Sequence, residues 1–124
     1  MEPENLQVLI VEDDPIQSLL LEKLFVSLDY KVAGKAESGR AAIDLAVKLK
    51  PDIITMDIML TDDIDGIDAA KEIQKEIETD LVYISGNKDE DIIKRASETD
   101  FIAFFRKPFD MRELKNFFSH VVHR

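Results

Sequence analysis

The sequence predicts a single three-layer α/β domain, in which a five-stranded parallel sheet lies between two layers of helices. Apolar runs of four to six residues alternate with longer stretches whose apolar residues recur every three or four positions, a pattern typical of repeating β-α units. Five such units fit in the 124 residues. Most of the runs are continuously apolar, as strands buried on both faces of a parallel sheet are, and right-handed crossovers place helices on both of its faces.

The first unit begins with a strand at Leu6–Val11. Asp14 and Pro15 predict the start of its helix, because Asp is a good N-cap and Pro suits the first helical position. The apolar stripe expected on this helix comprises Ile16, Leu19, Leu20, Leu24 and Leu28.

The second and third strands are expected at Lys31–Ala36 and Asp52–Met56. Ser38 predicts the N-cap of the second helix. The apolar positions of that helix are Ala42, Leu45 and Leu49. Those of the third helix are Ile67, Ala70, Ile73 and Ile77.

The fourth and fifth strands are expected at Leu81–Ile84 and Phe101–Phe105. The fourth helix has the weakest apolar stripe, with Ile92, Ile93 and Ala96. The last helix has a clear one, with Leu114, Phe117, Phe118, Val121 and Val122. Asp110 and Glu113 are placed to cap its start.

Composition limits the possible partners. The 26 acidic and 16 basic residues give a net charge of -10, which opposes direct binding to nucleic acid or to an anionic membrane surface. The absence of cysteine excludes disulfides and thiolate metal sites. The first residues do not resemble a signal peptide, and no apolar stretch approaches the roughly 20 residues that span a bilayer. We therefore expect a cytoplasmic protein.

Polar side chains follow four of the predicted strands. The residues after parallel strands meet at one edge of the sheet, where such folds bind their ligands. The converging positions are Glu12, Asp13 and Asp14, then Asp57, then Ser85 and Gly86, then Lys107 and Pro108. Carboxylates without nearby histidine or cysteine suit a hard cation such as Mg²⁺. Together with a lysine and a hydroxyl, they are the parts that phosphoryl transfer needs.

Four motifs in this order resemble the receiver domains of two-component response regulators, including the single-domain chemotaxis type. The motifs are Val11-Glu12-Asp13-Asp14-Pro15, Met56-Asp57, Ser85-Gly86 and Phe104-Phe105-Arg106-Lys107-Pro108-Phe109. The resemblance covers almost the whole chain. It implies a flavodoxin-like fold with strand order 2-1-3-4-5, and residues 1–124 are expected to form the receiver domain with no output domain.

The resemblance also implies the role of each site residue. Asp57 is expected to accept a phosphoryl group from a histidine kinase or a histidine phosphotransfer protein. Asp13, Asp57 and the backbone carbonyl of Met59 are expected to bind Mg²⁺, with Glu12 acting mainly through water. Ser85 and Lys107 are expected to contact phosphoryl oxygens. Met59 and Asn87 are candidates for modulating dephosphorylation.

The resemblance further implies a conformational switch. Phosphorylation adds charge and acceptor oxygens at Asp57, which would draw in Ser85 and Lys107 and let Phe104 turn into the space that Ser85 leaves. The surface that changes would comprise the fourth helix, the fifth strand and the fifth helix, where a downstream protein would bind. A cis Lys107–Pro108 bond is also expected.

The loop after Asp57 departs from the family pattern. Between Leu60 and Gly66 it has Thr61 where a proline is usual, and its glycine comes one residue late. The three aspartates of this loop are expected to add negative charge or to help recognise a partner. Gly86 stands where alanine is common, and we expect it to loosen the loop that must move.

Three other functions compete with phosphoacceptor signalling. A magnesium phosphatase of the haloacid dehalogenase type would use Asp57 as nucleophile, but such enzymes usually carry a second aspartate where this chain has Met59. A flavin binder of the flavodoxin type would need a first loop rich in Ser, Thr or Gly to bind phosphate, whereas Glu12, Asp13 and Asp14 would repel one. A pseudo-receiver would bind partners without phosphorylation. The expected protein is a signalling module that catalyses only its own phosphorylation and dephosphorylation.

Overall fold

The computed structural model describes residues 6–60, 63–86 and 89–121, and these form one α/β domain. All five strands pair in parallel, in the order β2-β1-β3-β4-β5. The strands are β1 (Gln7–Val11), β2 (Lys31–Ala36), β3 (Ile53–Met56), β4 (Asp80–Ser85) and β5 (Ala103–Arg106). The predicted sheet and its strand order are therefore confirmed.

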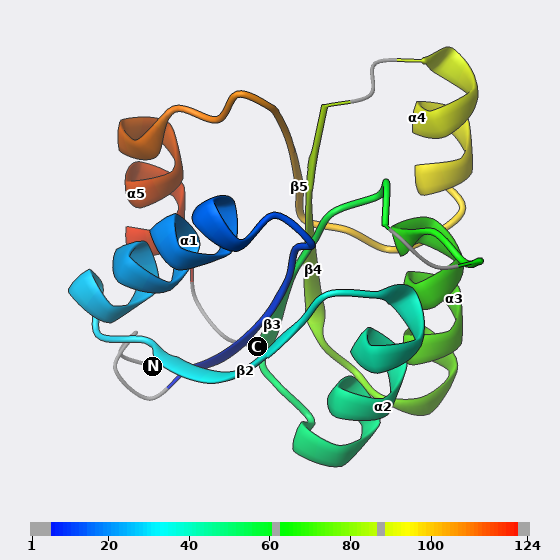
Figure 1. Ribbon diagram of the computed structural model, residues 1–124, viewed down its shortest axis with the longest axis horizontal. Coiled ribbons are helices and arrows are strands. Elements are labelled where there is room, and N and C mark those ends of the chain that lie inside the picture. Colours follow the sequence, from blue (N-terminus) through cyan, green and yellow to red (C-terminus); the bar gives the residue numbers. More distant parts are fainter. Residues whose placement is uncertain (1–5, 61–62, 87–88, 122–124) are drawn as a thin grey trace.

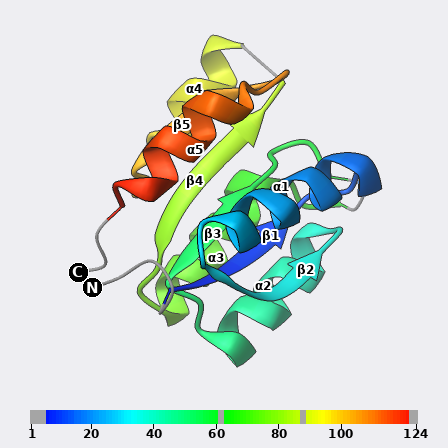
Figure 2. The same cartoon turned by 90° about the vertical axis from the view of Figure 1, so that its left-hand side faces the viewer.

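Helices cover both faces of the sheet (Figures 1 and 2). They are α1 (Pro15–Ser27), α2 (Gly39–Leu49), α3 (Gly66–Glu76), α4 (Glu90–Ala96) and α5 (Met111–Ser119). In Figure 1, α1 and α5 lie on the left of the sheet and α2, α3 and α4 on the right. Each layer encloses its own apolar core against the sheet. No helix among the described residues is long and apolar enough to span a membrane.

The register of the central strands brings the acidic residues together. Val11 of β1 lies opposite Met56 of β3, and the Asp57 amide donates a hydrogen bond of 3.0 Å to the Val11 carbonyl. Glu12 and Asp57 are thus the next residues on two adjacent strands. The Lys107 amide bonds the Ser85 carbonyl at 3.0 Å and fixes the end of β5 beside the end of β4.

The predicted N-caps are confirmed at three helices. Asp14 accepts from the amides of Ile16 and Gln17 at the start of α1. Ser38 accepts from the Ala41 amide at the start of α2. Asp110 accepts from the Arg112 amide at the start of α5. The second predicted cap of α5, Glu113, lies in the first turn of this helix, where the helix dipole favours an acid.

The predicted buried face of α1 is partly wrong. Leu24 is buried as predicted, and Leu28 packs against the core. Ile16 is 71% exposed, and Leu19 and Leu20 are 48% and 41% exposed. The residues that α1 buries are Ser18, Leu21, Leu24 and Phe25. Apolar residues surround this helix on nearly all sides, so their spacing cannot identify the face that meets the sheet. The neighbouring aromatic ring of Phe118 on α5, 4.8 Å from that of Phe25, occupies the buried side.

Four of the five strands differ from the predicted bounds. β1 begins at Gln7 instead of Leu6, and β3 begins at Ile53 instead of Asp52. β4 gains Asp80 and Ser85, both of which pair with neighbouring strands. β5 begins at Ala103 instead of Phe101, whose ring packs against Tyr83 with 5.4 Å between centroids. Phe101 therefore contributes to the core from the loop that precedes β5.

Thr55 on β3 offers a test of packing in the sheet. The residue is 1% exposed, and its Oγ1 has no hydrogen-bond partner among the described residues. Burying an unpaired hydroxyl costs about 1–3 kcal/mol, and valine has nearly the same shape. Thr55→Val is expected to raise the free energy of unfolding by about 1 kcal/mol, measured by urea denaturation. A lower value in the variant would mean that the hydroxyl has a partner in solution.

Candidate functional site

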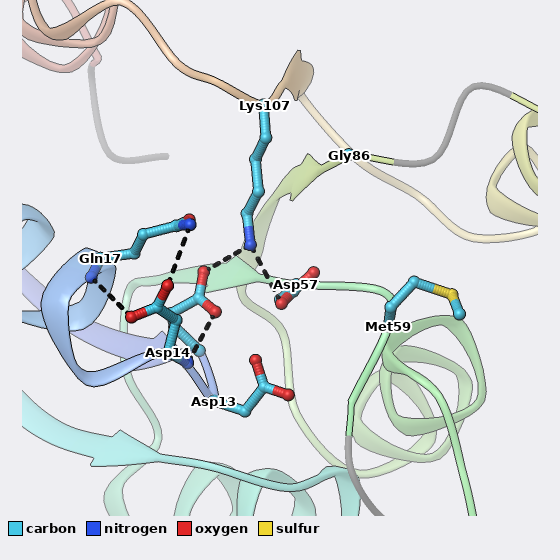
Figure 3. Close-up of a pocket in the computed structure, with 8 residues that line it drawn as sticks. Asp13, Asp14, Gln17, Asp57, Met59, Gly86 and Lys107 are labelled. Carbon is cyan, nitrogen blue, oxygen red and sulfur yellow. Dashed lines mark hydrogen bonds and ion pairs between the residues drawn. The ribbon is translucent and has the colours of Figure 1, made fainter.

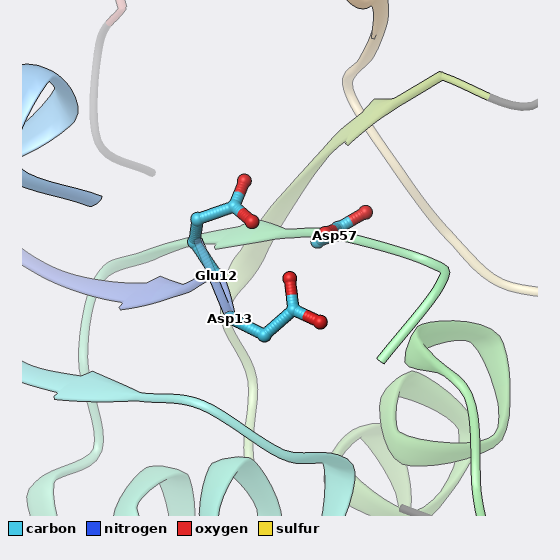
Figure 4. A group of neighbouring side chains, drawn as sticks. All are labelled: Glu12, Asp13 and Asp57. Carbon is cyan, nitrogen blue, oxygen red and sulfur yellow. The ribbon is translucent and has the colours of Figure 1, made fainter. Parts of the chain in front are cut away.

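Three carboxylates meet at the carboxyl ends of β1 and β3 (Figure 4). Glu12 and Asp13 follow β1, and Asp57 follows β3. One carboxylate oxygen from each of these residues lies within 4.8 Å of the other two. Glu12 and Asp57 are buried, at 3% and 5% exposed, while Asp13 is half-buried. Such a group of oxygen ligands suits Mg²⁺, which binds one or two carboxylates and retains water.

Lys107 is the cation that faces the three acids (Figure 3). Its Nζ lies 2.7 Å from Glu12 Oε1 and 3.1 Å from Asp57 Oδ2. The other oxygen of Glu12, Oε2, accepts a 3.0 Å hydrogen bond from the Asp14 amide. Glu12 is therefore fixed at both oxygens, and one lysine compensates the charge of two buried acids.

The pKa values of all three acids are raised above their ordinary range. Burial is the main cause for Asp57, and Lys107 opposes it. Burial also raises the pKa of Glu12 and of Asp13, and the pKa of Asp13 is raised further by the neighbouring Glu12. Burial lowers the pKa of Lys107, but contacts with Glu12 and Asp57 outweigh it, so the pKa is raised. The site thus favours added positive charge.

This electrostatic cost predicts a pH dependence in metal-free protein. Because the pKa of Asp57 is higher in the folded state, its stabilising contribution is complete below the unfolded pKa of about 3.9 and is lost as pH rises through the folded value. Relative to Asp57→Asn, the wild type should therefore lose free energy of unfolding as pH increases above about 4. Urea denaturation with a chelator across this range measures the difference. A wild type that gains stability relative to the variant would contradict the raised pKa.

The pocket over the carboxylates is lined by residues from four segments. They are Glu12, Asp13, Asp14, Gln17, Asp57, Met59, Gly86 and Lys107. The sequence did not indicate Gln17, whose Nε2 donates to Asp14 Oδ2 at 3.3 Å. Its position in the first turns of α1, near the acids, is the only signal that could have identified it. The Met59 side chain is 56% exposed at the pocket.

The other predicted site residues lie at different depths. Ser85 is completely buried and does not line the pocket, unlike the neighbouring Gly86. Phe104 is half-buried, and its ring centroid lies 5.8 Å from that of Tyr83. The Lys107–Pro108 bond is cis, as expected. Asn87, the candidate modulator of dephosphorylation, lies outside the described residues.

The loop after Asp57 is bound to two helices. Asp63 pairs with Arg40 of α2, with Nη2 2.9 Å from Oδ2, and Asp65 pairs with Arg95 of α4, with Nη1 2.7 Å from Oδ2. Two of the three loop aspartates are thus paired within the domain, and Asp62 lies outside the described residues. The expectation of added negative charge is wrong for Asp63 and Asp65, because each faces a guanidinium.

Gly66, at the end of this loop, lies against the backbone of Asp57. Its amide donates a 2.8 Å hydrogen bond to the Ile58 carbonyl. A Cβ at this position would lie 2.9 Å from the carbonyl carbon of Asp57 and 2.9 Å from Cα of Ile58, and closer still to the Asp57 carbonyl oxygen. In the sequence this glycine comes one residue later than in the family pattern. Its close contact with the Asp57 backbone leaves no room for a Cβ, so the position requires glycine.

Comparison with known proteins places this arrangement among signalling domains. The family model of the response regulator receiver domain matches residues 8–119. Chemotaxis protein CheY of Thermotoga maritima is 36% identical over 104 residues, which cover 83% of this chain and 86% of that protein. Transcriptional regulatory protein PdtaR of Mycobacterium tuberculosis is 32% identical over 108 residues, or 87% of this chain and 52% of that protein. The chain thus spans about half the length of that relative.

A solved structure shows the same fold. The receiver domain of sensor histidine kinase PA1611 from Pseudomonas aeruginosa PAO1, whose structure has a magnesium ion coordinated in the active site cleft, superposes with a TM-score of 0.80. Identity is 25%, and the match covers 91% of this chain and 93% of that chain. The match to the family model runs from β1 to α5. The chain therefore belongs to the response regulator receiver domain family of two-component signalling.

Proposed function

We propose that Asp57 is the phosphoacceptor of this receiver domain. The observation that carries the proposal is its carboxylate, buried at the end of β3 with Lys107 Nζ at 3.1 Å and two further acids beside it. One Asp57 oxygen would attack the phosphorus of a phosphohistidine. The P–N bond would break, the imidazole nitrogen would keep its electron pair, and an acyl phosphate would form on Asp57.

The acidic residues fit a bound Mg²⁺. Asp13 and Asp57 would hold the ion directly with the Met59 carbonyl, and Glu12, already bonded to Lys107, would act mainly through water. When bound, Mg²⁺ supplies positive charge to the oxygens of the transferred group. Support comes from the three carboxylates within 4.8 Å and from the magnesium ion in the receiver domain of PA1611.

Ser85 and Lys107 would contact the phosphoryl oxygens after transfer. Lys107 would exchange part of its bonding to Asp57 for the new acceptor atoms. Ser85, which is buried, would move toward the phosphoryl group. Phe104 would then turn from its half-buried place beside Tyr83 into the space that Ser85 leaves.

The phosphodonor partners of this family are histidine kinases and histidine phosphotransfer proteins. We propose that the downstream partner binds the surface formed by α4, β5 and α5, because the movement of Phe104 would change the shape of this surface. Direct binding to nucleic acid is disfavoured by the net charge of -10. Phosphorylation by a histidine kinase would place the domain in the cytoplasm. Met59 and Asn87 are candidates for modulating the lifetime of the phosphoryl group.

Small phosphodonors test the proposal without the partner kinase. Incubation with acetyl phosphate and Mg²⁺ is expected to add one phosphoryl group, detected by intact mass spectrometry. Asp57→Asn should abolish the addition, because the amide is not a nucleophile for phosphorus, and a chelator should prevent it in the wild type. Unchanged labelling of the variant would overturn the assignment of Asp57.

The same preparation separates the competing functions. A magnesium phosphatase would turn over a phosphate monoester such as p-nitrophenyl phosphate many times, whereas the receiver domain is expected to consume only its own phosphoryl group. A pseudo-receiver would remain unlabelled with an intact fold. The contacts of Lys107 with both Asp57 and Glu12 favour the phosphoacceptor over the pseudo-receiver.

A further inference from the structure

Arg95 of α4 binds the loop that follows Asp57 through Asp65. Its Nη1 lies 2.7 Å from Asp65 Oδ2 and its Nη2 lies 3.3 Å from Asp65 Oδ1. Nη2 also donates to Asp68 Oδ1 at 3.1 Å. The guanidinium thus spans the last residue of the loop and the first turn of α3, a two-point contact that fixes position as well as charge.

This contact is better shielded than the other arginine contact of the loop. The side chains of Arg95 and Asp65 are 36% and 26% exposed, whereas those of Arg40 and Asp63 are 67% and 68% exposed. Both pairs are bidentate, since Arg40 donates from Nε and Nη2 to Asp63. Exposed pairs contribute less to stability than partly buried ones, because water screens them. Arg95 therefore constrains the loop more firmly than Arg40 does.

Asp65 links the contact with Arg95 to the backbone of Asp57. Its Oδ1 accepts from the Asp68 amide at 2.9 Å and caps α3. The next residue, Gly66, bonds the Ile58 carbonyl at 2.8 Å and lies against the Asp57 carbonyl group. A shift of Asp65 would therefore act, through Gly66, on the backbone of Asp57 and Ile58.

The helix that carries Arg95 rests on the aromatic residues of the sheet. Ala96 is fully buried, and its carbonyl accepts from Thr99 Oγ1 at 2.7 Å. Thr99 Oγ1 in turn lies 2.8 Å from the Tyr83 hydroxyl, and Phe104 packs on Tyr83. Arg95 thus stands between the loop of Asp57 and the aromatic group that includes Phe104.

We propose that Arg95 is a positioning residue for phosphorylation, which couples the place of α4 to the geometry of the loop that carries Asp57 and Met59. The proposal rests on the proposed function of Asp57. Displacement of α4 by a partner would release Asp65 and weaken Mg²⁺ binding at the acidic residues. By thermodynamic reciprocity, Mg²⁺ binding would favour the α4 position seen here.

The chain offers a matched control in Lys71. This residue of α3 pairs with Glu98, just after α4, at 2.6 Å. Lys71→Met therefore removes one cation and one link between the same two parts of the fold, but does not touch Asp65. Arg95→Met removes the link through Asp65, and Arg95→Lys keeps the charge without the two-point geometry.

Two measurements test the proposal. Mg²⁺ is titrated into unphosphorylated protein and followed by the thermal midpoint, and initial rates with acetyl phosphate are measured against Mg²⁺ concentration. Arg95→Met is expected to raise the Mg²⁺ dissociation constant, fitted from the rise of the thermal midpoint with Mg²⁺ concentration, by about three- to tenfold, and to raise the Mg²⁺ concentration for the half-maximal rate by the same factor. Arg95→Lys should be intermediate, and Lys71→Met should stay within about twofold of the wild type.

Each outcome decides between explanations. Equal shifts in Arg95→Met and Lys71→Met would overturn the proposal, because the effect would then belong to α3–α4 packing in general. Wild-type values in Arg95→Met would overturn it too. If Arg95→Met does not fold, Arg95→Lys decides, since wild-type Mg²⁺ dependence in that variant excludes a role for the two-point contact. Failure of the proposed function is distinct, because the wild type itself would then remain unphosphorylated.

Discussion

Lys107→Met is expected to lower the free energy of unfolding of metal-free protein by about 3 kcal/mol at neutral pH. Lys107 bonds Glu12 and Asp57, whose side chains are 2% and 5% exposed. Methionine keeps most of the apolar length of the side chain but removes the cation that pairs with these acids in the described part of the chain. Proton uptake by the carboxyls limits the cost, at about 1.4 kcal/mol for each unit of pKa shift. Urea denaturation in the presence of a chelator gives the value.

A double variant separates charge from packing. Asp57→Asn removes one negative charge from the same group, so Lys107→Met should cost less in that background, with a coupling of about 1–2 kcal/mol. Mg²⁺ should also restore part of the stability of Lys107→Met, because it binds only the folded acidic site. Equal losses in both backgrounds would show that Lys107 acts through its methylene chain and not through its charge.

The positions of the main site residues could be predicted because topology alone brings them together. Continuous apolar runs identified the parallel strands, and residues that follow such strands must meet at one edge. Glu12, Asp13, Asp57 and Lys107 therefore needed no knowledge of side-chain packing. The N-caps were equally local, since Asp14 and Ser38 bond amides two or three residues away.

What the sequence could not predict depends on how helices sit relative to one another. The contact of Arg95 with Asp65 joins residues 30 positions apart, and that of Arg40 with Asp63 joins residues 23 apart. No periodicity marks such pairs. The prediction of the buried face of α1 was partly wrong for a related reason. Leu19 and Leu21 are equally apolar, and only packing against α5 and the sheet distinguishes them.

The lengthened loop shows why both kinds of information are needed. Sequence spacing alone showed that Gly66 comes one residue late and left its effect on the site open. In the structure Gly66 lies against Asp57 and Asp65 caps α3. The end of the lengthened loop therefore lies directly against the backbone of Asp57.

Gly66→Ala is expected to destabilise the domain by about 3 kcal/mol and to reduce phosphorylation of Asp57 by acetyl phosphate at least tenfold. The added methyl group would meet backbone atoms of Asp57 and Ile58 at 2.9 Å or less, and backbone cannot rotate away as a flexible side chain can. Relief requires the Asp57 segment to move, and small displacements of a reacting group cost large factors in rate. Urea denaturation and initial labelling rates measure the two effects.

Gly86→Ala is the matched control for stability. Among the described residues, a Cβ at Gly86 would meet only the Lys107 Cβ, at the ordinary contact distance of 3.8 Å. Alanine also restricts the unfolded chain more than glycine does, so this variant should be neutral or more stable by up to about 1 kcal/mol. If both substitutions were tolerated equally, Gly66 would not be in close contact with Asp57, and the loop would have room to shift without moving the phosphoacceptor. A loss confined to Gly66→Ala would instead tie the position of this glycine to the geometry of Asp57.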